Sequence, residues 1–201
     1  HVEGGIARYT VDENWVIPHF EKMLYDNTQF ILLLSKCCKI INEDYFKKKL
    51  EQTIEFLKKE FTNKDNLLGS AFDADSEGVE GRYYVYDYTE IKDIDNISNY
   101  FELDPRGNWE NKTILIEKKI PPKEIIDKLL IIRRKKKKPF FDDKTQLDLN
   151  CLWISALISA HDILPKNNYL KLAEDFYSKV EEKYINNSVQ HSYTKEVVFL
   201  E

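Results

Sequence analysis

Two kinds of helical segment alternate along this chain, and the alternation constrains the fold more than any other feature. Segments 18–41 and 147–164 are apolar on nearly every side, whereas segments 43–61 and 167–184 carry one apolar stripe and a polar face. A helix that is apolar all round has to be packed all round, but a striped helix can face solvent. The pattern therefore favours inner helices wrapped by outer ones, as in an α/α toroid.

Local signals predict where these helices begin and end. Pro18 suits the first turn of a helix, because its missing N–H would have no partner there. Asn42 and Thr89 can cap the helices that follow them. A further striped segment, 122–138, ends in a run of basic residues that complement the negative end of the helix dipole.

Short segments between the helices are rich in aromatic and β-branched residues, which is typical of strands. Residues 69–74 and 82–88 flank an acidic stretch that contains glycine, which predicts a hairpin with a long tip. Polar and apolar residues alternate along 188–200, which predicts a second hairpin. Hairpins inserted between ring helices would stand over one mouth of the toroid, and loops in such places commonly carry function.

Composition and charge exclude several classes of protein. The chain has 30 Lys and Arg against 35 Asp and Glu, a net charge of −5, which argues against a nucleic-acid binder. It has no apolar run near the roughly 18 residues of a membrane span, and its start lacks the pattern of a signal peptide. Three cysteines, two of them adjacent, do not make a secreted disulfide framework. We expect a cytoplasmic protein.

The segment 8–27 is the densest in reactive side chains. If residues 18–41 form one helix, His19, Lys22 and Asp26 share a face. Polar groups on the face of a buried helix can be explained by an inward cleft. The alternative is that His19 belongs to a hydrogen-bonded cluster at the entrance of the helix.

Three carboxylates stand at alternate positions, Asp73, Asp75 and Glu77, followed by a glycine. A helix-loop-helix calcium site would need a glutamate at the twelfth position, which is Tyr84 here, so we predict no metal site. Sugar chemistry commonly uses two carboxyl groups, one to protonate the leaving oxygen and one to activate water or attack. Solvated turn residues are the other interpretation.

Asp142, Asp143 and Lys144 stand directly before the most apolar helix, and Asn150 follows one to two turns inside it. Carboxylates at this end of a helix stabilise it by capping and by interaction with its dipole. The functional interpretation places them at the mouth of the ring.

Together these motifs resemble, in order along the chain, the thioredoxin-domain-containing family typified by mammalian spermatogenesis-associated protein 20. The residues that carry the resemblance are Asp12, Trp15, Asn150 and the segments 4–6, 8–9, 18–27, 73–78, 80–81, 83–86, 107–110, 113–115, 142–144, 191–193 and 199–201. The chain departs from the family pattern at Leu149 and Cys151, which replace a tryptophan and a glycine, and at Ala7, which replaces a histidine.

The resemblance implies an N-terminal thioredoxin-like domain followed by a six-hairpin, glycosidase-like (α/α)6 toroid similar to N-acylglucosamine 2-epimerase. Residues 1–201 would then be mainly α, a partial (α/α)6 toroid with inserted β-hairpins. The thioredoxin-like domain and the C-terminal half of the toroid would lie outside this chain. A partial toroid leaves apolar faces of inner helices uncovered, so we expect poor solubility when it is expressed by itself.

Two hypotheses for the function follow. In the first, the toroid acts on a sugar-like small molecule by general acid/base catalysis, without metal or cofactor. In the second, it is a non-catalytic scaffold for the thioredoxin-like domain. The first predicts that the candidate residues converge on one cavity: His19, Asp26, Asp73, Asp75, Glu77, Asp142 and Asp143 for catalysis, and Trp15, Tyr83, Lys144, Asn150 and His191 for substrate binding.

Overall fold

The computed structural model describes residues 1–41, 43–186 and 188–192, and the chain divides into two compact units. The hairpin unit comprises His1–Lys22 and Phe72–Phe140. The helical unit comprises Met23–Ala71 and Phe141–Glu201. The chain passes between the units at strands β3 (Lys22–Met23), β4 (Ala71–Phe72) and β9 (Phe141–Asp142), which are hydrogen-bonded in the order β3-β4-β9.

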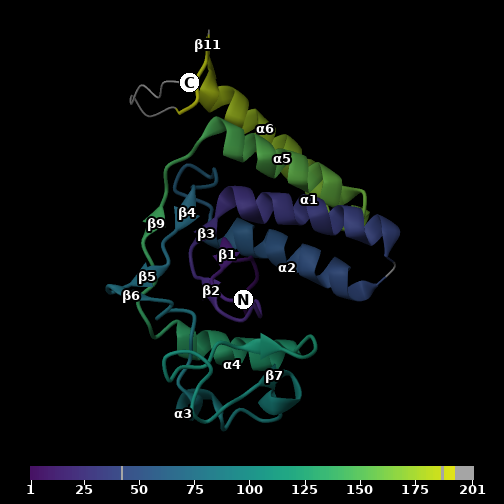
Figure 1. Cartoon of the computed structure of the whole chain (residues 1–201). Helices are drawn as coiled ribbons and strands as arrows, with labels where there is room; N and C mark the ends of the chain where they lie inside the picture. The colour runs from purple at the N-terminus through teal and green to yellow at the C-terminus, as the bar shows by residue number, and fades with distance from the viewer. Residues whose placement is uncertain (42, 187, 193–201) are drawn as a thin grey trace. The chain divides into compact units, whose positions relative to one another are not determined.

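Four helices make up most of the helical unit (Figure 1). They are α1 (Leu24–Ile40), α2 (Asp44–Glu60), α5 (Leu147–His161) and α6 (Tyr169–Tyr184). Helix α1 packs against both α2 and α5, and α5 packs against α6. A 3-10 turn, η2 (Pro165–Asn167), precedes α6, and strands β10 (Ile185–Asn186) and β11 (Ser188–Val189) follow it as an antiparallel pair.

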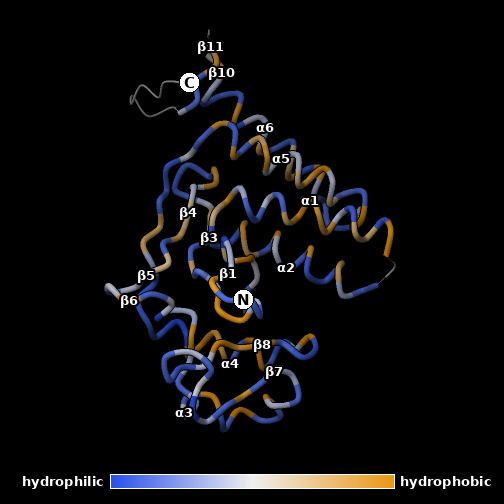
Figure 2. The backbone as a smooth tube through the Cα atoms, viewed as in Figure 1, coloured by the Kyte–Doolittle hydropathy of each residue, from blue (hydrophilic) through white to orange (hydrophobic). Residues whose placement is uncertain are grey.

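Helices α2 and α6, which carry one apolar stripe each, bury that stripe as their sequences predict. Helix α2 buries Leu50, Ile54 and Leu57, and α6 buries Phe176 and Val180. Figure 2 shows hydrophilic and hydrophobic residues alternating along both helices. Each therefore contributes one face to the core and leaves the other to solvent.

The two helices that are apolar all round are not packed all round within the described residues. On α1, the exposed fraction of Leu33 is 55%, and on α5 that of Ile158 is 48%. The opposite faces are fully covered, since Ile31 and Trp153 have no exposed surface. Each of these helices thus has an apolar face that nothing in the described structure covers.

The prediction that one helix runs from Pro18 is wrong, because α1 begins at Leu24. Pro18 and His19 instead form strand β2, which pairs antiparallel with β1 (Tyr9–Thr10), Tyr9 opposite His19. The side chain of Asp12 ties the turn that brings the two strands together, so strand pairing replaces the first helical turns. His19 consequently does not share a helix face with Asp26. The expected cap at Asn42 lies outside the described residues.

The prediction of a hairpin with a long tip is also wrong. A shorter hairpin forms within the expected tip, where β5 (Asp75–Ser76) pairs with β6 (Val79–Glu80) around a two-residue turn. Both turn residues, Glu77 and Gly78, have positive φ (55° and 74°), which suits the right-handed twist of paired strands. Gly81, with φ 68°, then turns the chain, so residues 82–88 do not continue as a strand.

The rest of the hairpin unit holds two further helices and one strand pair. The helices are α3 (Tyr88–Ile91) and α4 (Lys123–Arg133), with a 3-10 turn, η1 (Ile97–Asn99), between them. Strand β7 (Phe101–Glu102) pairs antiparallel with β8 (Ile116–Glu117). Asp87 rather than Thr89 precedes α3, and its backbone N–H donates to the Glu90 carboxylate at 2.9 Å.

Two apolar clusters form the core of the hairpin unit. One joins α4 to the turns before it through Tyr86, Ile91, Ile97, Phe101 and Leu129. The other is smaller and gathers Phe20, Ala74, Val85 and Ile114. In the part of the chain that the structure describes, no helix is long and apolar enough to cross a membrane.

Replacement of Gly78 and of Gly81 by alanine separates two contributions to the loss of stability, the backbone conformation and steric overlap. Both glycines have positive φ, so Gly78→Ala, whose new Cβ meets open space, should cost about 1–2 kcal/mol of unfolding free energy. Gly81→Ala should cost about 2–5 kcal/mol, because its Cβ would also overlap the ring of Phe20. Urea denaturation followed by far-UV circular dichroism measures both; equal losses would contradict the packing described here.

Candidate functional site

A loop held by one carboxylate joins β1 to β2. Asp12 Oδ1 accepts hydrogen bonds from the backbone N–H groups of Val16 (2.9 Å) and Ile17 (2.6 Å), and from Thr10 Oγ1 (2.9 Å). The Ile17 hydrogen bond is the largest of the causes that lower the pKa of the Asp12 carboxyl group. Trp15 stands in this loop with φ 58° and an exposed fraction of 84%, so the loop presents an indole ring to solvent.

His19 lies between two carboxylates of the hairpin unit. Its Nδ1 is 2.9 Å from Glu80 Oε1, and its Nε2 is 3.8 Å from Glu21 Oε2. Glu21 also pairs with Arg8 at 3.0 Å, and the ring of Tyr9 stacks on the imidazole at 4.7 Å. With its proton on Nδ1, the imidazole donates to Glu80 and leaves Nε2 as a base.

The three candidate carboxylates of the β5–β6 hairpin are exposed. Asp73 Oδ1 accepts from the backbone N–H of Asp75 at 3.3 Å, and Glu77 pairs with Arg82 Nε at 3.3 Å. Asp75 and Glu80 stand opposite each other in the hairpin. Of the two, Glu80 is the one in contact with His19.

Tyr83 is buried, with an exposed fraction of 4%. The guanidinium of Arg133 lies 5.0 Å from the centre of its ring. This contact occupies a face of the ring and ties Tyr83 to α4, which is a structural role.

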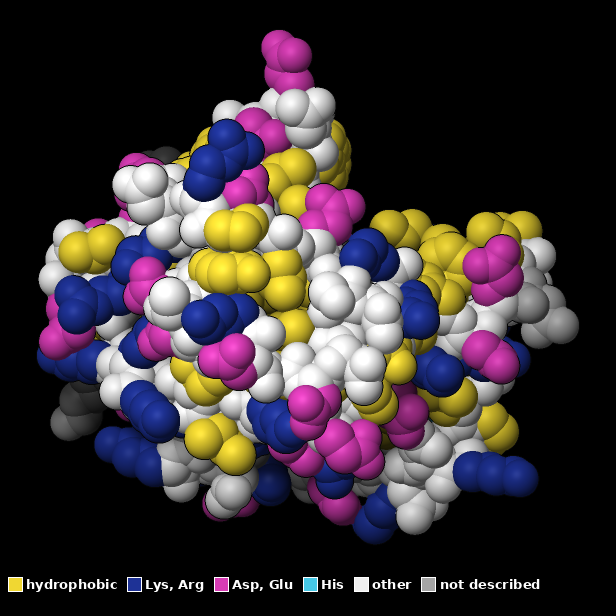
Figure 3. Space-filling view, turned by 90° about the horizontal axis from the view of Figure 1, so that it is seen from below, with side chains coloured by type: hydrophobic (Ala, Val, Ile, Leu, Met, Phe, Trp, Pro, Cys, Tyr) yellow, Lys and Arg dark blue, Asp and Glu magenta, His cyan; other side chains and the backbone are white. Residues whose placement is uncertain are grey.

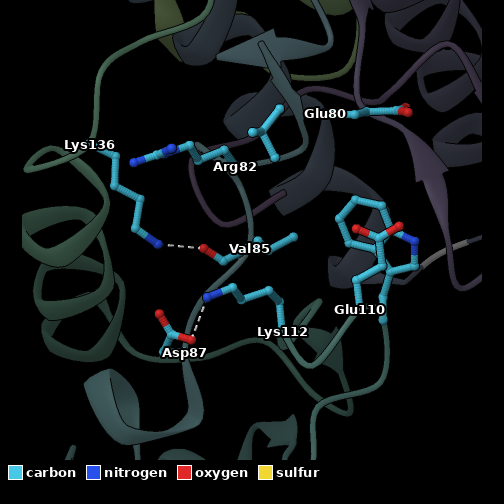
Figure 4. A pocket seen from close by; sticks show the side chains of 9 residues that line it. Glu80, Arg82, Val85, Asp87, Glu110, Lys112 and Lys136 are labelled. Carbon is cyan, nitrogen blue, oxygen red and sulfur yellow. Dashed lines mark hydrogen bonds and ion pairs between the residues drawn. The ribbon is translucent and has the colours of Figure 1, made fainter. Parts of the chain in front are cut away.

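A pocket of about 380 Å³ lies beside the His19–Glu80 contact, because Glu80 is one of its walls. The other lining residues come from segments 79–87 and 109–112 and from the basic run after α4, as Figure 4 shows. They are Val79, Arg82, Val85, Asp87, Trp109, Glu110, Lys112 and Lys136. Lys112 Nζ pairs with Asp87 at 2.7 Å, and Lys136 Nζ donates to the Val85 carbonyl at 2.7 Å.

One wall of the pocket is a tightly turned loop. Trp109 and Lys112 form a bridge around Glu110 and Asn111, which both have positive φ (46° and 58°). The side chain of Asn108 fixes the base of the loop through hydrogen bonds of 2.8 Å to the carbonyl and to the N–H of Ile114. Positive φ in two consecutive non-glycine residues is strained, and here the strain places Trp109 and Glu110 at the pocket.

Sequence reasoning missed most of these lining residues. Lys136 belongs to the basic run that the sequence predicts as the C-terminal end of a helix, yet its side chain is 19% exposed and contacts Val85. Lys112 and Arg82 carry no motif of their own. The available signal was the segment 107–110, whose glycine and asparagine predict a turn next to an aromatic residue.

The face of the molecule that Figure 3 shows carries no broad patch of one charge. Lys and Arg side chains are intermixed there with Asp and Glu, and hydrophobic side chains form small groups between them.

The remaining candidates lie in the helical unit. Asp26 is in the first turn of α1. Asp142 Oδ1 accepts from the backbone N–H of Lys144 at 3.2 Å, a local turn contact that lies before the N-cap of α5 at Gln146, and the Asp143 carbonyl accepts from Asn63 Nδ2 at 3.2 Å. The side chains of Asp143 and Lys144 are exposed.

Asn150 is fully buried and holds two segments of backbone together. Its Oδ1 accepts from the N–H of Leu68 at 2.9 Å, and its Nδ2 donates to the Leu68 carbonyl at 3.1 Å and to the Gln146 carbonyl at 3.0 Å. These contacts use both ends of the amide. They show a structural role for Asn150.

His191 lies at the start of α5. Its Nε2 is 3.3 Å from Asp148 Oδ1, and its carbonyl accepts from the N–H of Leu147 at 2.9 Å. The segment after β11 thus provides a partner for one of the N–H groups at the helix terminus.

The candidate residues therefore form two sets. His19, Asp73, Asp75, Glu77, Trp15 and Tyr83 belong to the hairpin unit, and Asp26, Asp142, Asp143, Lys144, Asn150 and His191 belong to the helical unit. Convergence of the two sets on one cavity stays a prediction. Among the described residues, no group of three or more His, Cys, Asp or Glu side chains could hold a metal ion.

The cysteines lie in the helical unit and are free thiols. Cys37 and Cys38 are half-buried on α1, and Cys151 is exposed on α5. Burial raises the pKa values of Cys38 and Cys151. Both thiols are therefore largely protonated at neutral pH and are weak nucleophiles.

The chain is similar to parts of longer proteins. It is 27% identical over 222 residues to uncharacterized protein B0495.5 of Caenorhabditis elegans, covering 87% of this chain and 30% of that protein. It is 30% identical over 100 residues to human spermatogenesis-associated protein 20 and 31% identical to the mouse protein, covering 47% of this chain and 13% of each of theirs. No family model matches the chain.

These relatives confirm the coarse form of the resemblance: the chain is homologous, over about half its length, to spermatogenesis-associated protein 20. It spans less than a third of the length of these relatives. Among solved structures, a D-mannose isomerase matches 98% of this chain and 51% of its own chain, with 14% identity and a TM-score of 0.35.

Replacement of Asn150 tests its structural role. Asn150→Ala leaves the buried N–H and carbonyl of Leu68 without their partner, which should lower the unfolding free energy by about 2–4 kcal/mol. Ser155→Ala on the same helix, at an exposed position, should change it by less than about 0.5 kcal/mol. Chemical denaturation compares the two; an Asn150→Ala loss as small as that of Ser155→Ala would contradict the assignment.

The Asp12 loop should be sensitive to acid. Because the folded-state pKa of Asp12 lies below its ordinary value of 3.8, the stabilisation is present above that value and is lost as the pH falls through the lowered pKa. Hydrogen exchange of the Val16 and Ile17 amides should therefore accelerate in Asp12→Asn at pH 6, relative to wild type. The difference should shrink below pH 3.8. Asp95→Asn, at an exposed site, is the control; equal exchange in all three proteins at pH 6 would refute the role of the carboxylate.

Proposed function

We propose that this chain is part of a thioredoxin-domain-containing protein like spermatogenesis-associated protein 20, and that it helps to form a site acting on a carbohydrate or sugar-like metabolite. The chemistry we propose is general acid/base catalysis. The observation that carries the proposal is the 2.9 Å contact between His19 Nδ1 and Glu80 Oε1, in which Glu80 is also a wall of the pocket. Glu80 lines the cavity, and its carboxylate holds the imidazole that we propose as the proton-transferring group.

The roles of the two residues follow from this geometry. Glu80 accepts a hydrogen bond from Nδ1–H, which orients the imidazole so that Nε2 can take up a proton from the substrate. The imidazolium then returns that proton to the neighbouring carbon or oxygen of the substrate. Isomerisation and epimerisation of sugars need this removal and return, and hydrolysis needs the same acid and base. Glu21, 3.8 Å from Nε2, is a second carboxylate beside the reacting nitrogen.

The lining of the pocket supports a sugar-like ligand. Its volume of about 380 Å³ lies in the usual range for small-molecule sites, about 300–1,000 Å³. Trp109 offers an apolar ring face to the C–H groups of a sugar, and the charged side chains around it are partners for hydroxyl groups.

For the helical unit we propose the first part of an (α/α)6 toroid. Its two helical hairpins, α1–α2 and α5–α6, pack through α1 and α5, so these two helices are central and the striped helices are peripheral. An apolar groove of about 410 Å³ runs between α5 and α6 and is lined by Ile154, Ile158, Leu170, Ala173 and Tyr177 among others. Further helices of a ring would cover these residues.

The same groove supports a second candidate function, a non-catalytic scaffold that binds a thioredoxin-like domain. Ile158 and Leu170 are 48% and 42% exposed, and exposed apolar patches commonly mark interaction sites. Under this alternative the His19–Glu80 contact is structural, and no sugar is turned over.

Proton exchange with solvent tests the catalytic proposal directly. The full chain is incubated in D2O with a panel of aldoses, ketoses and their phosphates, and loss of sugar C–H signals is followed by proton NMR. A base that removes and returns a proton exchanges it for deuterium. Release of nitrophenol from nitrophenyl glycosides tests hydrolysis in parallel.

His19→Gln and Glu80→Gln should each lower the rate found in this screen by about 10²–10⁴-fold. His161→Gln, on α5 of the helical unit, should leave it unchanged. Full activity of both His19→Gln and Glu80→Gln would overturn the assignment. Absence of turnover across both panels would favour the scaffold.

A further inference from the structure

The cations of the pocket are placed on one side of it. In the view of Figure 4, the charged ends of Arg82 and Lys136 extend to the same side, whereas the carboxylate of Glu80 points to the opposite side. Glu80 is in contact there with His19. The third cation of the lining, Lys112, pairs with Asp87 at 2.7 Å. Lys112 and Asp87 therefore largely neutralise each other.

Arg82 has N–H donors on its two terminal nitrogens that can bind a ligand. Its ion pair with Glu77 uses Nε at 3.3 Å, and its two terminal nitrogens form no ion pair among the described residues. Glu77 lies in the exposed turn of the hairpin, and 51% of the Arg82 side chain is exposed. The planar fork of a guanidinium matches two oxygens of a phosphate or carboxylate.

Lys136 is a more rigidly held charge. Its side chain is only 19% exposed, and its Nζ donates to the Val85 carbonyl at 2.7 Å and lies 3.3 Å from Glu90 Oε2. The ring of Tyr86 lies 5.2 Å from the same nitrogen. These contacts fix the ammonium group at the pocket wall, where Glu90 is its charged partner and the carbonyl and the ring carry no net charge.

We propose that the pocket takes a ligand with a phosphate monoester, bound by Arg82 and Lys136 on this side, with the sugar-like part against Trp109. The inference rests on the proposed function and specifies its substrate class, a phosphorylated sugar-like metabolite. A phosphate dianion suits two cations on one side of a pocket better than a carboxylate, which has one charge, and better than a neutral sugar. The Glu80 carboxylate points away from Arg82 and Lys136 and remains in contact with His19.

Isothermal titration of the full chain with inorganic phosphate, glucose 6-phosphate, glucuronate and glucose tests this proposal. We expect saturable binding of phosphate and glucose 6-phosphate, and weaker binding of glucuronate and glucose. Arg82→Ala should weaken binding of glucose 6-phosphate by about 10–100-fold, the effect of losing hydrogen bonds to a charged group. Arg82→Lys should lie between Arg82→Ala and wild type, since it keeps the charge and loses the fork.

A matched control is Arg106→Ala, because Arg106 is a 90% exposed arginine of the same unit that pairs with Asp104 outside the pocket. It should leave the affinity unchanged. Failure of phosphate and glucose 6-phosphate to bind, equal losses in Arg82→Ala and Arg106→Ala, or tighter binding of glucuronate would overturn the proposal.

The proposal and the catalytic function can fail separately. If neutral sugars are turned over through His19 and Arg82→Ala has no effect, the phosphate assignment fails and the proposed function stands. If glucose 6-phosphate binds through Arg82 but His19→Gln retains full turnover, the phosphate site stands and the proposed catalysis fails.

Discussion

Two buried cations hold the hairpin unit together. Lys22 has no exposed surface, and its Nζ donates to the Gly4 carbonyl at 2.7 Å and lies 5.4 Å from the ring of Tyr84. Arg133 is 2% exposed and forms an ion pair with Glu3. A buried charge is costly unless it is paired and hydrogen-bonded, so these contacts leave the N-terminal segment little freedom. Three segments that are distant in sequence are thereby brought into one unit.

The candidate site follows from these anchors. His19 stands three residues before Lys22, and Arg82 stands directly before the Tyr83–Tyr84 pair that the two cations contact. Lys136 follows Arg133 by three residues and reaches the Val85 carbonyl. The buried contacts are therefore structural, but they determine which side chains meet at the pocket. A substitution at Lys22 or Arg133 would act on the site by disturbing this arrangement.

Much of the helical unit could be predicted from the sequence, because long segments with a 3.6-residue period leave few alternatives. Helices α2, α5 and α6 begin and end within a few residues of expectation. Residues 18–23 do not form the predicted helix, because the turn held by Asp12 outweighs the helix signal of Pro18. Of the site, His19 was predicted, but Glu80 was not predicted as its partner. The two residues are 61 positions apart and no local pattern links them.

Mapping of the ligand on the chain tests the central claim most directly, because it reports position as well as affinity. The account predicts that glucose 6-phosphate shifts nitrogen–proton NMR signals of residues 79–87 and 109–112 and the indole signal of Trp109, with smaller changes in the helical unit. Shifts confined to helices α1, α2, α5 and α6, with the Trp109 indole unmoved, would contradict it.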